Sequence, residues 1–317
     1  MELVVKKIPP MKGDETDSPL AGRTERTYLF FKVTYNHHRD VSRSTLQEVR
    51  DYYEPAECEC VLCLPESYRA DGEETQLVIC CHGAGGRVLE AENQIGGVKY
   101  ASRCVDEGFA VLDVNGSNEH GFTQGCPAHV FALHRAYLYA VKHYNLSRRV
   151  LVAGASMGGQ TAMNYVNTYP GEVLAAGLIY PRLNAESFTT ADGHLCVGVW
   201  DRVDKIRVGM NCRHHLACNY DFPNRDEWCE ENILGFNPYR TRSFINSDGE
   251  RVVIPPCPIK VWQGLEDLTV DHVISEEFVK SVRRGGCYIE YRQIEGWGHK
   301  MSPVIREELM LWFDRFR

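Results

Sequence analysis

Short apolar runs alternate with segments of helical periodicity along most of this chain. Strands are expected at the runs, which are rich in β-branched and aromatic residues. These expected strands are residues 28–35, 58–65, 77–81, 109–115, 149–152, 175–180, 259–262 and 288–294. Helices are expected at residues 89–107, 128–144, 161–166, 271–284 and 303–316. The alternation predicts an α/β fold with a mostly parallel central sheet and helices on both of its faces.

The alternation stops between residues 182 and 256, a stretch too long for a plain connection in a compact domain. Aromatic side chains lie among its charges, and part of it has the pattern of a short capped helix. We interpret residues 182–256 as a lid or cap inserted after the strand at 175–180; a peripheral decoration is the alternative. Residues 28–181 and 257–317 then form the core, and residues 1–27 form a polar lead-in.

The strongest chemical signal lies between an expected strand and an expected helix. The sequence Gly-Ala-Ser-Met-Gly occupies residues 154–158, with Ser156 at its centre. A Gly-x-Ser-x-Gly sequence in this position is typical of a nucleophile elbow, a sharp turn that holds a serine exposed. The glycines leave room where the strand and helix backbones crowd together. A Gly-rich turn with an incidental serine is the alternative interpretation.

A serine hydroxyl is a weak nucleophile at neutral pH, so it needs a neighbouring base, which a carboxylate orients. Asp267 follows the strand at 259–262, and His299 lies in a Gly-flanked loop after the last strand. The order serine, acid, histidine is the one expected for this architecture. Glu266 and Asp271 are the alternative acids, and a capping role in the last helix is the alternative for His299.

A second Gly-rich loop, His82-Gly-Ala-Gly-Gly, follows the strand at residues 77–81. Glycines at a strand end allow a backbone N–H group to approach a ligand closely. We expect His82 to shape this loop rather than to act in catalysis. Asp113, Asn118 and His120, in and after the next strand, are candidates to which the sequence assigns no role.

The 13 cysteines show no regular metal-binding pattern. Cys58 and Cys60 share one face of their expected strand and Cys63 points to the other, so one strand cannot gather all three thiolates. The spacing of Cys212, His214, His215, Cys218 and Cys229 matches no regular zinc pattern. We therefore expect no metal and no organic cofactor, and thiols that pack as small apolar groups.

Composition and charge narrow the classes of function. The 317 residues are 44% hydrophobic and 25% charged, as in ordinary globular domains. A net charge of −8 argues against a nucleic-acid or anionic-membrane surface. No secretory signal or membrane-spanning run is visible, so we expect a cytoplasmic protein with reduced thiols. A homo-oligomer remains open.

As a set, four segments resemble the α/β-hydrolase family, in its serine esterase and peptidase branch. They are the loop that starts at His82, the sequence around Ser156, Gly264-Leu-Glu-Asp267 and Gly298-His299. The resemblance extends over about residues 28–317 in the order of the elements. It implies Ser156 as the nucleophile, His299 as general base and then acid, and Asp267 as the group that orients the histidine.

The same resemblance implies an oxyanion hole. The backbone N–H groups of Met157 and Ala84 would form it, with Gly85 as the alternative to Ala84. The expected activity is the hydrolysis of carboxylic esters through an acyl-enzyme. The loop at His82 also resembles those of acetyl-xylan and cinnamoyl esterases, so a small-acyl or carbohydrate-linked ester, of acetyl or feruloyl type, is the expected substrate.

Two other functions stay open. One is a serine peptidase of the prolyl-oligopeptidase branch, whose members often carry a large N-terminal propeller for which this chain has no room. The other is a non-catalytic binding protein on the same fold. The presence of Ser156, Asp267 and His299 speaks against the second.

Overall fold

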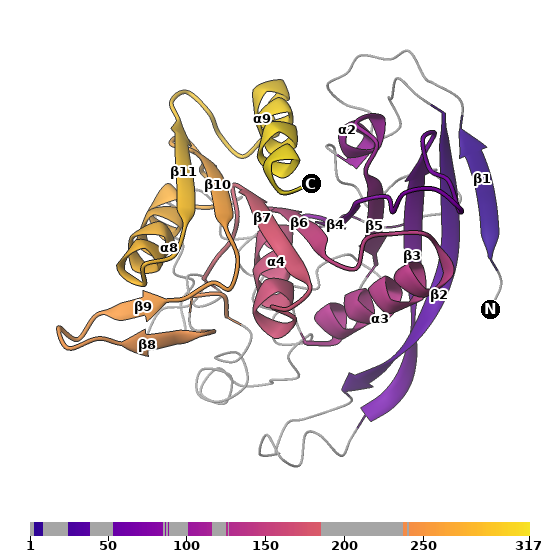
Figure 1. Cartoon of the computed structure of the whole chain (residues 1–317). Coiled ribbons are helices and arrows are strands. Elements are labelled where there is room, and N and C mark those ends of the chain that lie inside the picture. The colour runs from indigo at the N-terminus through magenta and orange to yellow at the C-terminus, as the bar shows by residue number, and fades with distance from the viewer. Residues whose placement is uncertain are drawn as a thin grey trace.

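The computed structural model describes residues 3–8, 25–38, 53–84, 86, 88, 101–115, 125, 127–184, 237–239 and 241–317. Their strands form a nine-stranded sheet in the order β1-β2-β3-β5-β4-β6-β7-β10-β11, and a pair, β8-β9 (Figure 1). The bounds are β1 Val4–Ile8, β2 Arg26–His38, β3 Tyr53–Pro65, β4 Leu77–Cys81, β5 Ala110–Val114, β6 Val150–Ala155, β7 Val173–Ile179, β8 Ser243–Ile245, β9 Arg251–Val253, β10 Ile259–Gly264 and β11 Ile289–Ile294.

The large sheet is parallel over most of its width. Strands β5, β4, β6, β7, β10 and β11 pair in parallel, whereas β1, β2 and β3 pair antiparallel and β3 also meets β5 antiparallel. The carboxyl ends of the parallel strands therefore lie along one edge of the sheet. The loops after β4, β6, β7, β10 and β11 all leave from that edge, which places their residues near one another.

Helices cover both faces of the sheet (Figure 1). On one face lie α3 Pro127–His143, α4 Met157–Thr168 and α8 His272–Arg284, and on the other lie α2 Ala101–Asp106 and α9 Pro303–Phe313, which continues as a 3₁₀ turn, Asp314–Phe316. Strands β4, β5 and β6 are buried at every position. A parallel strand covered on both faces has no polar side, which explains the apolar runs without alternation.

This architecture confirms the predicted fold class, an α/β fold with a mostly parallel sheet and helices on both faces. The predicted division of the cysteines is also confirmed. Cys58 and Cys60 pack in the core under α3, whereas Cys63 packs in the opposite core with α2 and α9. All three are free thiols.

The antiparallel edge differs from the prediction. Strand β1 lies within the stretch expected to be a polar lead-in, and its two lysines obscure the strand pattern in the sequence. Strands β2 and β3 extend beyond their apolar runs and pair over thirteen residues each. Backbone hydrogen bonds between paired strands do not depend on apolar side chains, so polar ends are included.

Several sequence-based expectations fall outside the described residues. They include most of the proposed lid, residues 185–236, and the oxyanion alternative Gly85. Asn118, His120 and the group Cys212, His214, His215, Cys218 and Cys229 lie there as well. Of the helices that the structure describes, none combines the length and the apolar character needed to cross a membrane.

Candidate active site

Ser156 occupies a strained turn between β6 and α4. Its backbone has φ 57° and ψ −124°, a conformation that costs a residue with a side chain about 1–3 kcal/mol. A Cβ atom at Gly154 would overlap the carbonyl oxygen of Gly158, and one at Gly158 would overlap that of Cys81. Both overlaps are with backbone atoms, so only glycine fits at either position. The predicted reason for the two glycines is confirmed.

Backbone hydrogen bonds hold this turn from both sides. The N–H of Ser156 donates to the carbonyl of Ile179, 3.0 Å away. The carbonyl of Ser156 accepts from the N–H groups of Gly159, at 2.9 Å, and Arg182, at 3.0 Å. The last residue of β7 and the segment after it therefore fix the strained residue, and the hydroxyl projects from a rigid turn.

The structure brings Ser156, His299 and Asp267 into one line of hydrogen bonds. His299 Nε2 lies 2.8 Å from Ser156 Oγ, and His299 Nδ1 lies 2.7 Å from Asp267 Oδ2. A carboxylate can only accept, so Nδ1 carries the proton and Nε2 accepts from the serine hydroxyl. The imidazole is thus oriented to take the serine proton.

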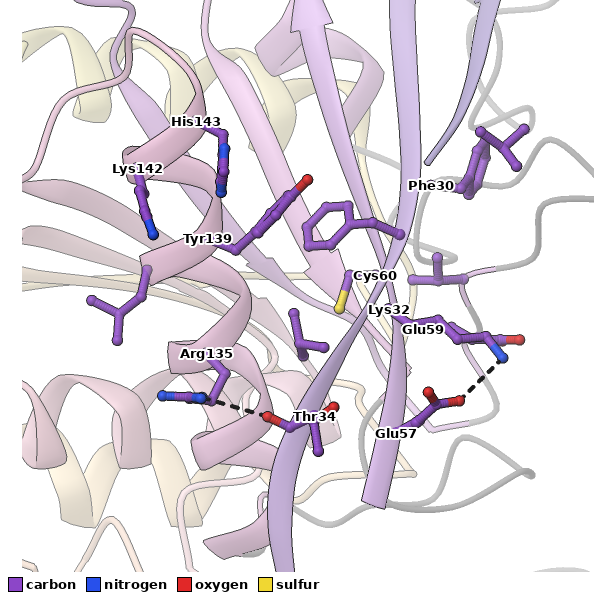
Figure 2. Close-up of a pocket in the computed structure, with 15 residues that line it drawn as sticks. Phe30, Lys32, Thr34, Glu57, Glu59, Cys60, Arg135, Tyr139, Lys142 and His143 are labelled. Atoms are coloured by element: carbon purple, nitrogen blue, oxygen red, sulfur yellow. Dashed lines mark hydrogen bonds and ion pairs between the residues drawn. The ribbon is translucent and has the colours of Figure 1, made fainter. Parts of the chain in front are cut away.

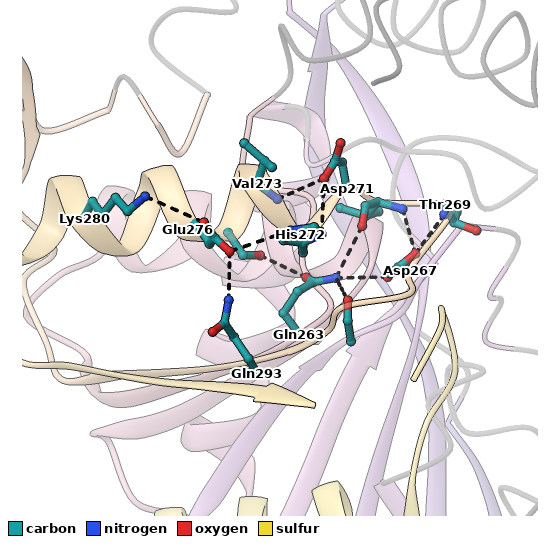
Figure 3. A network of polar contacts seen from close by, with 12 residues as sticks. Gln263, Asp267, Thr269, Asp271, His272, Val273, Glu276, Lys280 and Gln293 are labelled. Carbon is teal, nitrogen blue, oxygen red and sulfur yellow. Dashed lines mark hydrogen bonds and ion pairs between the residues drawn. The ribbon is translucent and has the colours of Figure 1, made fainter. Parts of the chain in front are cut away.

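Four donors surround the carboxylate of Asp267, whose side chain is fully buried. Figure 3 shows Asp267 beside two of them, Gln263 and Thr269. Its Oδ1 accepts from the N–H groups of Thr269, at 2.8 Å, and Val270, at 2.9 Å. Its Oδ2 accepts from Gln263 Nε2, 3.2 Å away, and from His299. These bonds satisfy a buried charge and fix the oxygen that faces the imidazole.

Gln263 is a part of this site that the sequence analysis missed. It is fully buried near the end of β10, and its Oε1 accepts from the hydroxyl of Ser275 at 3.0 Å. The sequence did contain a signal, because Gln263 is a polar residue between Trp262 and Gly264 at the end of a buried strand. A polar residue there needs partners, and Asp267 is one of them.

Backbone hydrogen bonds join the loop after β10, which contains Asp267, to the loop after β11, which contains His299. The N–H of Leu265 donates to the carbonyl of Ile294 at 3.1 Å, and that of Glu266 donates to the carbonyl of Trp297 at 2.9 Å. A Cβ atom at Gly264 would overlap the same Trp297 carbonyl. The absence of a side chain at Gly264 therefore lets Asp267 and His299 lie within hydrogen-bond distance.

The structure gives Asp271, an alternative acid, a capping role, and it assigns the capping of α9 to a residue other than His299. Asp271 is the N-cap of α8, where its carboxylate accepts from the N–H of Val273 at 3.0 Å. Ser302, not His299, caps α9 and accepts from the N–H of Val304 at 3.1 Å. Of the acids considered, Asp267 is the one that the structure places against the imidazole.

The Gly-rich loop after β4 lies beside Ser156. A Cβ atom at Gly83 would be 3.6 Å from Ser156 Cβ, and the N–H of Gly86 closes a tight turn on the carbonyl of Gly83 at 3.0 Å. Ala84 is exposed in this turn. Met157 is buried at the first position of α4. Met157 therefore directly follows the serine, and Ala84 directly follows Gly83, the residue that lies near Ser156.

His82 supports this loop from the interior of the protein. It is fully buried, and its Nδ1 lies 3.2 and 3.3 Å from the two carboxylate oxygens of Asp113. A Cβ atom at Gly86 would lie 2.8 Å from His82 Cβ, so the turn rests directly on the imidazole. Burial raises the pKa of the Asp113 carboxyl, and the neighbouring His82 opposes this shift. The hydrogen bonds of His82 Nδ1 are to Asp113 and not to Ser156, His299 or Asp267.

A separate hollow of about 930 Å³ opens over β2, β3 and α3 (Figure 2). Its lining includes Phe31, Cys60 and Tyr139 and none of Ser156, Asp267 and His299. Burial raises the pKa of the Cys60 thiol well above its usual value, so this group is a poor nucleophile. The Cys60 thiol is therefore no rival to Ser156 as a nucleophile.

In the part of the chain that the structure describes, no three His, Cys, Asp or Glu side chains are grouped so that they could hold a metal ion.

No protein-family model matches the chain, and no curated protein matches it in sequence. Solved structures do match. The rice cell wall degrading esterase LipA from Xanthomonas oryzae is 15% identical, with a TM-score of 0.62 over 92% of each chain. A puromycin-hydrolyzing peptidase from Mycobacterium tuberculosis is 17% identical, with a TM-score of 0.59 over 89% of this chain and 40% of its own.

The acylaminoacyl peptidase of Pyrococcus horikoshii is 14% identical, with a TM-score of 0.57 over 93% of this chain and 46% of its own. This chain has the α/β-hydrolase fold. It spans less than half the length of these two peptidases. Identities this low establish the shared fold only, so the comparisons leave activity and substrate open.

We predict that Gly264→Ala disrupts the site while the protein still folds. The added methyl group displaces the Trp297 carbonyl and with it His299, and a displacement of about 1 Å typically costs about 100-fold in rate. The measurement is the rate at which a fluorophosphonate labels Ser156. Gly171→Ala is the matched control, because a Cβ atom there meets nothing within 4 Å. Equal labelling rates for the two variants would contradict the prediction.

We also predict that Gln263→Leu slows labelling of Ser156 by about tenfold and lowers the free energy of unfolding by about 1–3 kcal/mol, because buried polar partners are left unsatisfied. Gln293→Leu is the control, since Gln293 bonds to the side chain of Glu276 on the surface. Denaturant unfolding and labelling kinetics test both effects. A Gln263→Leu variant that labels as fast as the control would show that Asp267 needs no such support.

Proposed function

We propose that this protein is a serine hydrolase that cleaves carboxylic esters through an acyl-enzyme on Ser156. One observation carries the proposal, namely the hydrogen bonds of 2.8 and 2.7 Å that join Ser156 Oγ, His299 and Asp267. Along the chain, His299 is 32 positions from Asp267 and 143 positions from Ser156. A serine, an imidazole and a buried carboxylate in this order form the arrangement that activates a hydroxyl for acyl transfer.

The first half of the proposed reaction forms the acyl-enzyme. Ser156 Oγ attacks the ester carbonyl carbon while His299 Nε2 takes its proton, and the carbonyl electron pair moves to oxygen. The N–H groups of Met157 and Ala84 and the N-terminus of α4 face that developing charge. His299 then protonates the alcohol oxygen as the tetrahedral intermediate collapses and the carbon–oxygen bond of the leaving group breaks.

The second half releases the acid. His299 takes a proton from water, whose oxygen attacks the acyl carbon, and returns the proton to Ser156 Oγ as the acyl–enzyme bond breaks. Asp267 orients the imidazole and stabilises the imidazolium that forms twice in the cycle. These steps use only side chains, backbone N–H groups and water.

The size and type of the substrate are the finer part of the proposal. We favour a small-acyl or carbohydrate-linked ester, such as an acetyl or feruloyl ester of a sugar. LipA supports this choice, because it matches along 92% of both chains and is described as an esterase that degrades rice cell wall. The Gly-rich loop at His82, similar to those of acetyl-xylan and cinnamoyl esterases, supports the same class.

Peptide hydrolysis is the second candidate. The peptidases from Mycobacterium tuberculosis and Pyrococcus horikoshii share the fold across 89% and 93% of this chain. The same Ser156, His299 and Asp267 serve either reaction, since an amine then leaves in place of the alcohol. Amides are less reactive than esters, so a peptidase also cleaves activated esters, whereas an esterase leaves amides uncut.

We predict that Ser156→Ala lowers kcat/KM for p-nitrophenyl acetate by at least about 10⁴-fold. The fold should persist, because alanine also has a Cβ atom and therefore adopts this strained backbone conformation at a similar cost. Circular dichroism and a melting temperature within a few degrees of the wild type check the fold. Substantial residual turnover by the folded variant would remove Ser156 from the mechanism.

We predict that an ester panel separates the candidates. Acetyl, butyryl and feruloyl esters and acetylated sugars should be cleaved faster than palmitoyl esters, and aminoacyl amides should stay intact. Turnover of aminoacyl amides that Ser156→Ala abolishes would establish the peptidase alternative, even where esters are cleaved faster. Absence of ester and amide turnover, together with no fluorophosphonate labelling, would indicate a binding protein.

A further inference from the structure

The ring of Tyr180 lies against the imidazole of His299. The two ring centroids are 4.4 Å apart and the planes are inclined by 56°. The hydrogen bonds of His299 hold the edges of its ring, at Nδ1 and Nε2, and leave the faces of the ring to other contacts. Tyr180 is the first residue after β7. Its ring gives His299 a contact of a different kind from the hydrogen bonds of Ser156 and Asp267.

The backbone of Tyr180 is fixed in an unfavourable conformation. Its φ is 37°, and among the described residues other than glycine only Ser156 and Arg242 also have positive φ. Its N–H donates to the carbonyl of Trp262 in β10 at 2.7 Å. A non-glycine residue keeps such a conformation only where its surroundings enforce it, and these positions concentrate at functional sites.

The residues on both sides of Tyr180 hold the nucleophile. Ile179 accepts from the N–H of Ser156, and Arg182 donates to the carbonyl of Ser156, each at 3.0 Å. Pro181 packs on Gly159 of α4 so closely that a Cβ atom at Gly159 would overlap it. The same short segment therefore fixes Ser156 through its backbone and meets His299 through its one aromatic side chain.

We propose that Tyr180 is a positioning residue that keeps the imidazole of His299 in line between Ser156 and Asp267. The inference rests on the proposed function and deepens it. The ring restricts rotation of the imidazole about its side-chain bonds, and its π-electrons stabilise the imidazolium that forms in each half-reaction. The contact itself needs only the ring and not the hydroxyl.

The phenol of Tyr180 stays neutral in this setting. Burial, and then the negative charge of Asp267, raise the pKa of Tyr180 to about 12. A neutral ring adds no second negative charge beside Asp267 at the pH where an imidazole acts as a base. Replacement by phenylalanine should therefore preserve the effect.

The test compares Tyr180→Phe, Tyr180→Leu and the control Tyr288→Leu. Tyr288 precedes β11, at the end of that strand opposite His299, and is 52% exposed. Three readouts are used: the rate of Ser156 labelling by a fluorophosphonate, kcat and KM for p-nitrophenyl acetate, and the downfield proton resonance of His299 Nδ1–H.

Tyr180→Leu should lower both the labelling rate and kcat by about tenfold, leave KM within about twofold, and broaden or shift the Nδ1–H resonance. Tyr180→Phe and Tyr288→Leu should each stay within about twofold of the wild type. A folded Tyr180→Leu variant with wild-type labelling and kcat would overturn the proposal, as would a Tyr180→Phe variant impaired as strongly as Tyr180→Leu.

If Tyr180→Leu does not fold, the wild type and Tyr180→Phe decide. Nuclear Overhauser contacts between the ring protons at position 180 and the imidazole protons of His299 are expected in both, and their absence contradicts the proposal. The labelling rate keeps this test separate from the proposed function. A probe reacts with any activated serine, so slow labelling of Tyr180→Leu supports the role of Tyr180 even if the wild type cleaves no ester.

Discussion

The positive φ of Ser156 is the constraint on which the rest of the site depends. A strand must end and a helix must begin within one residue, so that the hydroxyl projects and the first N–H groups of α4 face the same space. Close packing of backbone on backbone offsets the free-energy cost of this strained turn, and that packing requires glycine at 154 and 158. Hydrogen bonds from the last residue of β7 and the segment after it hold the turn from the other side.

The parallel sheet delivers the remaining groups to this turn. Because β6, β10 and β11 run in the same direction, their following loops leave one edge and bring serine, acid and histidine together. The loops after β10 and β11 touch through backbone atoms, and a missing side chain at Gly264 permits that contact. Precision in the hydrogen bonds of His299 thus comes from rigid elements and close-packed loops.

The elements of the core could be predicted from the sequence because apolar runs and helical periodicity report burial directly. Ser156, Asp267 and His299 could be named because each follows a strand in an expected order. The support for these residues was less visible in the sequence. Gln263 had one signal, a polar residue at the end of a buried strand. Tyr180 acts through a contact between separate segments, and no local pattern marks a tyrosine that packs on a distant imidazole. Strand β1 was missed because edge pairing includes polar residues.

The most direct test of the account is a crystal structure of the protein after reaction with a small alkyl phosphonate that leaves a tetrahedral adduct. We expect phosphorus to be bonded to Ser156 Oγ. His299 Nε2 should then lie within hydrogen-bond distance of an adduct oxygen. The phosphoryl oxygen should accept from the N–H groups of Met157 and Ala84. An adduct on another residue, or one on Ser156 with His299 turned away from it and from Asp267, would contradict the account.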